Sequence, residues 1–378
     1  MKKSRKATAL AGTIAAALFS TVPAMPAHAD GIRNSQWHVR YLNLHQAHKI
    51  SEGNGVTVAI VDSGVFPHRD LAKNLRKGTD TVSGGDGTGQ VDKDGHGTHM
   101  AGVIGGHGHN ANDGVIGVAP SAQLIPVKSI GVVDNGLGLE AGIKWAADEG
   151  ADVINVSTGG PQSRGINQAV AAAIKADAIV VAATGNKSDT LKLGFPAAIP
   201  EVLAVAATDR NGTLADFSVT GPEVDVCAPG VDITTTDLSN RYGKGSGTSE
   251  ATAIVSGAAA LVRAKFPDLS AAEVIHRLTA TADDNGPPGR DDQCGYGVLN
   301  VVKALTAEVP PLEGGTTATA SAQPSVVAPS VESSAVPPDP EADAEDSNLP
   351  VIAGVAGGIA ALGVLLAFLV RRRRNPTA

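Results

Sequence analysis

Short apolar runs alternate with segments of helical periodicity through the middle of this chain. Runs rich in small and β-branched residues predict buried strands, and segments with apolar residues along one helical face predict helices between them. The predicted strands cover 56–61, 123–130, 153–156, 178–183 and 202–207, and the predicted helices cover 139–149 and 166–176. Strands that alternate with helices of this length indicate crossover units. The predicted fold class is therefore α/β, with a central mainly parallel sheet covered by helices on both faces.

Two more helices are predicted after the last of these strands. The residues from Ala251 to Phe266 are mostly small or apolar and contain no proline, which predicts a buried helix that ends before Pro267. Ser249 then stands at the start of this helix. Ser270 and Glu273 form a capping box, which marks the start of the next helix, over 270–280.

Both ends of the chain differ from this pattern. Four basic residues, an apolar run over 7–22 and the Ala-x-Ala pattern at 27–29 predict an export signal over residues 1–29. A retained N-terminal anchor is the alternative, and the shortness of the apolar run argues against it. The polar segment 30–54 follows as an N-terminal extension of the folded part.

Near the C-terminus, residues 349–370 form an uncharged apolar stretch that predicts a transmembrane helix, because about twenty helical residues span roughly 30 Å. The arginines that open the tail 371–378 place that tail in the cytoplasm by the positive-inside rule. The preceding segment 308–348 contains seven prolines among Ser, Thr, Ala and acidic residues, which is typical of an unstructured linker. We therefore expect one folded domain over 55–307, held outside the cell membrane by a single span.

The charge of the chain between its two apolar ends excludes some partners. All 38 acidic residues lie between these ends, whereas eight of the 30 basic residues lie within them. A domain and linker with such an excess of negative charge are poorly suited to bind nucleic acid or anionic lipid. No nucleic-acid partner is therefore expected.

The two cysteines of the chain are Cys227 and Cys294. Disulfides persist outside the cell, where the domain is predicted to lie. Pairing the two is the simplest hypothesis, and the closed loop would contribute about 4 kcal/mol to stability on a chain-entropy estimate. Two buried free thiols are the alternative.

The segment Gly245-Ser246-Gly247-Thr248-Ser249 offers a hydroxyl at the start of a long apolar helix. Unpaired backbone N–H groups and the positive end of the helix dipole stabilise negative charge there. Ser249 is thus either a nucleophile or an N-capping serine after a flexible loop. A serine nucleophile needs a base, which has to come from elsewhere in the chain.

Asp62 and His96 are the candidates for the base and its partner. Asp62 ends a buried strand, where side chains of a parallel sheet project into the crevice beyond the strand ends, although an Asx turn is the alternative. His96 lies between Gly95 and Gly97, which suggests a backbone that passes close to another group. A neutral imidazole takes the proton of a serine when a carboxylate holds its other nitrogen.

Asn186 follows the predicted strand 178–183, within Thr184-Gly185-Asn186. An amide at this position is able to donate to a carbonyl oxygen as that oxygen becomes an oxyanion. An ordinary turn is the alternative. Because both Asn186 and Asp62 follow interior strands, a functional role is favoured.

Together these segments resemble the subtilisin family of serine proteases. The order Asp, His, Ser along the chain is that of a subtilisin. The resemblance covers nearly all of 30–307 and implies a subtilisin-like three-layer α/β fold and hydrolysis of peptide bonds through an acyl-enzyme. The matching segments are Val58–Gly64, Gly95–Gly102, Asn186 and Gly247–Ser249, supported by Gly117–Pro120, Asp152–Ser157 and Ala228–Gly230.

The resemblance implies a role for each matching side chain. Ser249 is the implied nucleophile, His96 the general acid and base, and Asp62 the carboxylate that orients it. Asn186 and the backbone N–H of Ser249 form the implied oxyanion hole. The segment Ser157-Thr158-Gly159 resembles the edge that pairs with an extended substrate backbone. Proteins or peptides are therefore the expected substrates.

Two residues depart from the family pattern. Glu250 follows the implied nucleophile, where the family usually has an apolar or small residue, and Thr158 stands where leucine is frequent. A carboxylate at Glu250 either biases the enzyme toward basic substrates, or points to solvent or a local partner without any effect on selectivity.

The sequence indicates no cofactor and no catalytic metal. His96 and His99 as zinc ligands are an alternative, but no glutamate accompanies them as it does in zinc proteases. Calcium is common in the family, yet no contiguous ligand loop is evident. Asp86, Asp92 and Asp94 are equally consistent with a solvated loop.

The whole architecture resembles the mycosins, the subtilisin-like proteases that accompany type VII secretion in actinobacteria. A short N-terminal extension, a proline-rich linker, a membrane helix and a brief basic tail make up this resemblance. It implies a protease at the cell surface beside a secretion complex, acting on exported proteins. The alternatives are a tethered degradative or housekeeping protease, and a subunit that mainly serves as a scaffold for a membrane assembly.

Overall fold

The structure is a computed structural model that describes residues 31–110, 113–131 and 137–312. The predicted export signal, the linker beyond residue 312, the predicted transmembrane helix and the tail lie outside these residues. Within the described ranges, no helix is long and apolar enough to cross a membrane. The described residues all belong to one compact unit.

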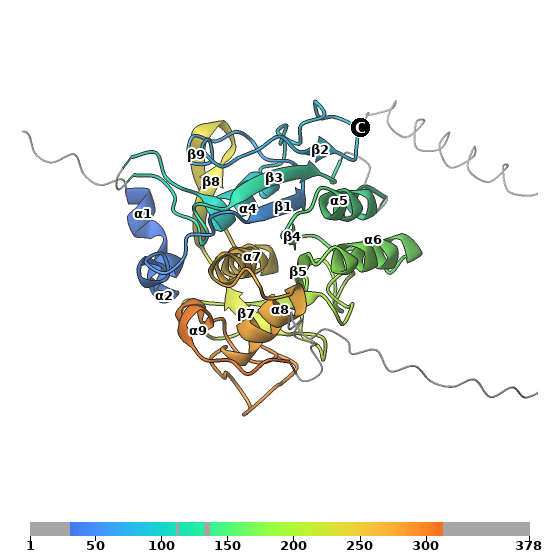
Figure 1. Ribbon diagram of the computed structural model, residues 1–378. Helices are drawn as coiled ribbons and strands as arrows, with labels where there is room; N and C mark the ends of the chain where they lie inside the picture. The colour runs from blue at the N-terminus through green and yellow to red at the C-terminus, as the bar shows by residue number, and fades with distance from the viewer. Residues whose placement is uncertain (1–30, 111–112, 132–136, 313–378) are drawn as a thin grey trace, which may run out of the picture. The chain divides into compact units, whose positions relative to one another are not determined.

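Seven parallel strands form the central sheet, in the order β2-β3-β1-β4-β5-β6-β7 (Figure 1). Most of their residues are buried, because helices cover both faces of the sheet. All five strands predicted from apolar runs are present, and the predicted α/β fold with a parallel sheet is confirmed. The strands are β1 (Thr57–Asp62), β2 (Thr79–Asp80), β3 (Gln123–Lys128), β4 (Val153–Val156), β5 (Ile179–Ala183), β6 (Leu203–Thr208) and β7 (Val226–Pro229).

The helices form one layer on each face of this sheet. Helices α4, α7, α8 and α9 contribute to the hydrophobic core on one face, and α5 and α6 to the core on the other. The chain moves across the sheet in one direction from β1 to β3 and in the other from β3 to β4 and β5. Because crossover connections have the same handedness, this reversal places the connecting helices on opposite faces of the sheet. The helices are α1 (Gly31–Ser35), α2 (Trp37–Tyr41), α3 (Leu44–Ala47), α4 (His96–Gly105), α5 (Leu137–Asp148), α6 (Arg164–Lys175), α7 (Thr248–Lys265), α8 (Ala271–Ala280) and α9 (Val301–Thr306).

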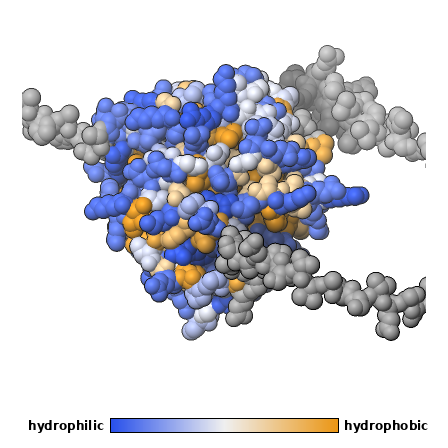
Figure 2. Space-filling model, in the orientation of Figure 1, coloured by the Kyte–Doolittle hydropathy of each residue, from blue (hydrophilic) through white to orange (hydrophobic). Residues whose placement is uncertain are grey.

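Helix α7 is the buried helix that the apolar run predicts. Its residues from Thr248 to Arg263 are all buried, and it contacts α4, α8 and strands of the sheet. The capping box of Ser270 and Glu273 at the start of α8 is also present. With apolar side chains turned inward, the outer surface in the same view is mostly hydrophilic, and its hydrophobic residues occur in small patches (Figure 2).

The segment before α7 departs from the prediction. The glycine-containing segment before α7 is not a flexible loop. It forms β9 (Arg241–Gly245), which pairs antiparallel with β8 (Ile233–Asp237) across the short turn η1 (Leu238–Asn240). Helix α7 is therefore preceded by a hairpin that packs against α4.

Cys227 and Cys294 form a disulfide, as predicted. Cys227 lies in the edge strand β7, and Cys294 lies in the loop between α8 and α9. Both residues are buried beside Val224 and Val298. The bridge fastens the segment after α8 to the edge of the sheet.

The described part of the N-terminal extension packs onto the domain. Trp37, Leu42, Leu44 and Ala47 belong to the same hydrophobic core as α7, whereas Tyr41 is 41% exposed. The indole N–H of Trp37 donates to the carbonyl of Val231 at 3.0 Å. The side chain of Gln36 donates to the carbonyl of Ile116 and accepts from its N–H, both at 3.0 Å. The extension is thus held by hydrogen bonds as well as by apolar contacts.

His38 on α2 makes this part of the fold sensitive to acid. Its side chain is fully buried, and neither ring nitrogen has a hydrogen-bond partner among the described residues. Burial, with a smaller contribution from Arg40, lowers the pKa of His38 to about 3. An unfolded chain protonates histidine near pH 6.5, so the unfolded state binds this proton first and stability falls as the pH drops below about 6.5. At pH 5 the loss amounts to about 2 kcal/mol.

We therefore expect His38→Leu to weaken the pH dependence of stability. Between pH 7 and pH 5, the free energy of unfolding of the wild type should fall by about 2 kcal/mol more than that of the variant. Urea denaturation followed by circular dichroism at the two pH values measures this difference. His45→Leu, at an exposed position on α3, is the matched control and should behave like the wild type. Equal pH dependence of the wild type and His38→Leu would contradict the account.

Candidate active site

The topology of the sheet marks one position for a site. Strand β1 lies between β3 and β4, so the chain reverses its direction across the sheet at this point. Open α/β sheets bind ligands in the crevice beyond the carboxyl ends of strands at such a reversal. Asp62 is the last residue of β1 and is fully buried. The fold thus places a carboxylate where a ligand is expected.

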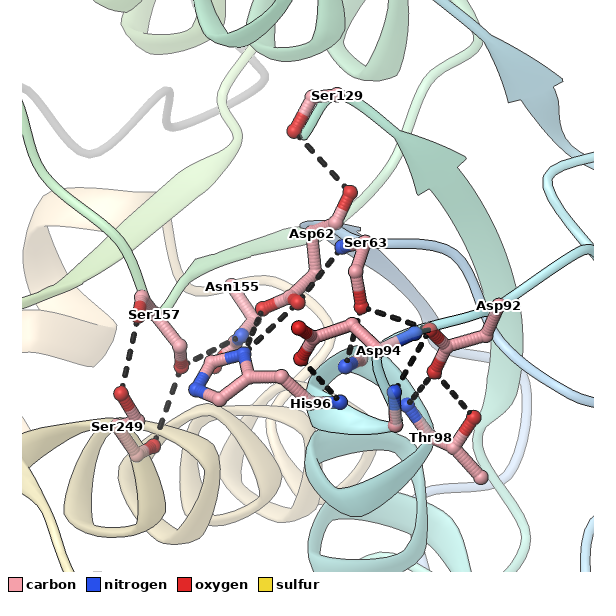
Figure 3. A network of polar contacts seen from close by, with 12 residues as sticks. Asp62, Ser63, Asp92, Asp94, His96, Thr98, Ser129, Asn155, Ser157 and Ser249 are labelled. Atoms are coloured by element: carbon pink, nitrogen blue, oxygen red, sulfur yellow. Dashed lines mark hydrogen bonds and ion pairs between the residues drawn. The ribbon is translucent and has the colours of Figure 1, made fainter. Parts of the chain in front are cut away.

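His96, the first residue of α4, is held by this carboxylate. Its Nδ1 donates to the two oxygens of Asp62 at 2.8 and 2.9 Å, and one of these oxygens also accepts the backbone N–H of Ser63 at 2.7 Å (Figure 3). The charge of Asp62 raises the pKa of His96 to about 9, against the effect of burial, and Glu250 and Asp94 add to the rise. The side chain of His96 remains 33% exposed.

The glycines around His96 are needed for this approach. Gly95 has a φ of +102°, a conformation that other residues rarely adopt. A Cβ atom on Gly97 would lie 2.1 Å from the carbonyl oxygen of Gly64, just after β1. The close passage that the glycines predict is therefore the contact between the start of α4 and the end of β1.

Asp92 holds the loop that carries His96, a role that the sequence did not predict. One of its oxygens accepts the hydroxyl of Ser63 and the backbone N–H groups of residues 94 and 95, at 2.9 to 3.0 Å. The other accepts the N–H and the hydroxyl of Thr98, at 3.1 and 2.6 Å. Asp92 is only 8% exposed, so its interpretation as part of a solvated loop is wrong. The signal in the sequence was the position of an aspartate a few residues before His96, because aspartate side chains often accept the backbone N–H groups of the turn that follows them.

Ser249 lies in the first turn of α7 and lines the same cavity as His96. Its hydroxyl donates to the carbonyl of Ser157 at 3.0 Å, and the hydroxyl of Ser157 donates to the carbonyl of Ser249 at 3.1 Å. Figure 3 shows the ring of His96 between Asp62 and Ser249. In the described part of the chain, no hydrogen bond joins the Ser249 hydroxyl to His96. The structure brings the three predicted side chains to one site, with the serine hydroxyl turned toward Ser157.

Asn186 follows β5 and is oriented by α7. Its Oδ1 accepts the backbone N–H of Thr248 at 3.1 Å and the hydroxyl of Thr248 at 3.4 Å. The Thr248 hydroxyl in turn accepts the backbone N–H of Gly185 at 3.2 Å. Because the oxygen end of the amide is engaged, the Nδ2 donor is left for the cavity, which Asn186 lines. The first-turn N–H groups of α7 lie beside it.

The segment Ser157-Thr158-Gly159 continues from β4 along the wall of the cavity. Gly160 exchanges two backbone hydrogen bonds with Phe195, at 3.0 and 2.9 Å, which fix the far end of the segment. Among the described residues, no partner occupies the backbone groups of Thr158 and Gly159. These groups are therefore available to pair with an extended peptide.

The cavity that contains these groups has a volume of about 890 Å³. It is large enough for several residues of a peptide. An imidazole held by a carboxylate, a hydroxyl within the same cavity and two N–H donors are the groups that acyl transfer requires. Within the described residues, no group of three or more His, Cys, Asp or Glu side chains is placed to hold a metal ion.

Comparisons with known proteins agree on one family. The sequence profile of the subtilase family matches residues 53–297. The chain is 40% identical over 254 residues to Subtilisin BL of Lederbergia lenta, covering 66% of this chain and 92% of that protein. It is 37% identical over 270 residues to the minor extracellular protease Epr of Bacillus subtilis (strain 168), covering 70% of this chain but only 41% of that longer protein. The solved structure of the serine protease MycP1, described as an essential component of the type VII (ESX-1) secretion system, matches with a TM-score of 0.64 at 33% identity, over 72% of this chain and 88% of that one.

Proposed function

Because this chain belongs to the subtilase family, we propose that it is a serine endopeptidase that cleaves peptide bonds through an acyl-enzyme on Ser249. The observation that carries the proposal is the bond of His96 to the buried Asp62, next to Ser249 in one cavity. A carboxylate-bound imidazole beside a hydroxyl is an arrangement that activates a serine.

In the first half of the reaction, an extended substrate pairs with the backbone of residues 158–159, which holds the scissile carbonyl over Ser249. The hydroxyl turns from the Ser157 carbonyl toward Nε2 of His96, which takes its proton as the oxygen attacks the carbonyl carbon. Asp62 keeps the proton on Nδ1 and stabilises the imidazolium that forms.

The negative charge that develops on the carbonyl oxygen is met by two donors, Nδ2 of Asn186 and the backbone N–H of Ser249. The N-terminal end of α7 adds its positive partial charge. His96 then gives its proton to the leaving amine, and the acyl group remains on Ser249. In the second half, His96 deprotonates a water molecule that hydrolyses this ester.

We further propose that the enzyme is held at the outer face of the cell membrane and processes exported proteins of a type VII secretion system. Two observations support this role. The fold is similar to MycP1, which is described as a component of such a system. The apolar segment 349–370 and the basic tail 371–378, which lie outside the described residues, have the pattern of a membrane anchor with a cytoplasmic end.

A comparison of three strains tests this role: wild type, Ser249→Ala and a deletion. We expect the protein in the membrane fraction, with its domain accessible to added protease on intact cells. In the Ser249→Ala strain, uncleaved forms of at least one exported protein should accumulate in the culture medium, as seen by mass spectrometry of protein termini. Normal processing in the Ser249→Ala strain, together with failed secretion in the deletion strain, would instead assign the protein a scaffold role.

A further inference from the structure

Glu250 places a carboxylate inside the candidate active site. It follows Ser249 in the first turn of α7, is only 5% exposed and lines the cavity that contains His96. The interpretation that it points to solvent is therefore wrong. A glutamate beside the attacking oxygen is available to contact the substrate.

The strand β9 makes room for this carboxylate. A Cβ atom on Gly245 would lie 1.8 Å from Oε1 of Glu250, and one on Gly247 would lie 3.0 Å from Oε2. Any larger residue at 245 would therefore displace the carboxylate. The same position on Gly245 is 3.4 Å from Nδ1 of His99 on α4. The carboxylate of Glu250 thus lies between the start of α7, the end of β9 and α4.

Within the described residues, no lysine or arginine forms an ion pair with Glu250. The charged groups that act on it are His96, which is engaged by Asp62, and Asp62 itself, which repels it. Burial raises the pKa of Glu250 to about 7, and its first-turn backbone and His96 oppose the rise. A buried carboxylate without a lysine or arginine partner is costly, and a cationic group that enters the cavity offsets part of that cost.

The position of Glu250 identifies which part of a substrate it meets. The edge segment 158–159 continues from β4 along the wall of the cavity, and in the proposed reaction it pairs with the acyl half of the peptide. Glu250 acts electrostatically on His96, the group that delivers its proton to the leaving amine in the proposed reaction. The residue that faces Glu250 is therefore the first one after the scissile bond.

We propose that Glu250 selects substrates with a lysine or arginine as the first residue after the scissile bond. The inference rests on the proposed peptidase function and names a class of substrate for it. A side-chain ammonium or guanidinium reaches the carboxylate, whereas an acidic side chain at the same position meets a like charge.

Three quenched fluorescent peptides that differ only in the first residue after the scissile bond, which is Lys, Gln or Glu, test the proposal. With the full-length protein at pH 8.5, where Glu250 is ionised, kcat/KM should be about tenfold higher for the Lys peptide than for the Gln peptide and lowest for the Glu peptide. Mass spectrometry of the products verifies that all three are cut at the same bond.

Two variants at this position separate charge from shape. Glu250→Gln keeps the size of the side chain and should bring the Lys-to-Gln ratio close to one. Glu250→Asp keeps the charge and should retain part of the preference. Glu223→Gln removes one charge at an exposed position that does not line the cavity and is the matched control, with an unchanged ratio.

Labelling by a fluorophosphonate, which reacts with activated serines, keeps the two proposals apart. A wild type that labels but cleaves the three peptides equally would overturn the role of Glu250 alone. So would a Glu250→Gln variant that labels and keeps the lysine preference. A wild type that neither labels nor cleaves any peptide would overturn the peptidase function itself.

Discussion

Replacement of Ser249 by alanine is expected to lower the rate of peptide hydrolysis by about 10⁶-fold, the scale known for the nucleophile of a subtilisin. The variant keeps the helix start, the cavity and Asn186, so it should still bind peptide. It has no oxygen that can form the acyl-enzyme, and only direct attack of water, assisted by the oxyanion hole and by substrate binding, remains. The measurement is kcat on a saturating fluorescent peptide, together with KM.

Ser188→Ala is the matched control for this experiment, since Ser188 is an exposed hydroxyl on the loop after Asn186. It should retain wild-type kcat and KM. Activity of Ser249→Ala within a hundredfold of the wild type would show that another residue is the nucleophile.

Asp62→Asn is expected to lower kcat by about 10⁴-fold, the scale known for this member of a serine protease triad. An amide in place of the carboxylate no longer holds the proton on Nδ1 of His96 and no longer stabilises the imidazolium. The pH profile should move as well. His96 acts as a base only when neutral, so in the wild type kcat/KM should rise with pH through a pKa above the usual 6.5 and toward about 9.

Because Asp62 is the largest cause of the raised pKa of His96, the rising limb in Asp62→Asn should move to lower pH. Asp94→Asn provides a graded comparison. Asp94 contributes least among the causes named for His96, so this variant should shift the limb only slightly in the same direction. A limb that stays in place when Asp62 is replaced would contradict the pairing of the two side chains.

Much of the fold follows from local pattern. Strand β4 has the same limits, Val153 to Val156, in the prediction and in the structure, because three of its four residues are apolar and β-branched, which favours a buried strand. Helix α8 begins where its capping box predicts. The hairpin of β8 and β9 was missed because Gly243 and Gly245 are typical of loops. These two positions need glycine because of neighbours outside the strand: a side chain there would collide with His99 or Glu250.

Only some residues of the candidate site could likewise be predicted from the sequence. Asp62, His96 and Ser249 could be predicted, because their chemistry is tied to residue type and to the ends of recognisable elements. The role of Asp92 could not, since its five hydrogen bonds come from a loop conformation that no periodicity describes. The burial of Glu250 could not either, because an acidic residue in the first turn of a helix is ordinary at an exposed N-terminus.

The most direct test of the account is to treat the full-length protein with a fluorophosphonate and to map the modified residue by mass spectrometry. We predict a single stoichiometric adduct on Ser249, lost in His96→Ala as well as in Ser249→Ala, because the hydroxyl reacts only when His96 takes its proton. An adduct that persists in His96→Ala, or no adduct in the wild type, would contradict the claim that Asp62, His96 and Ser249 form one catalytic unit.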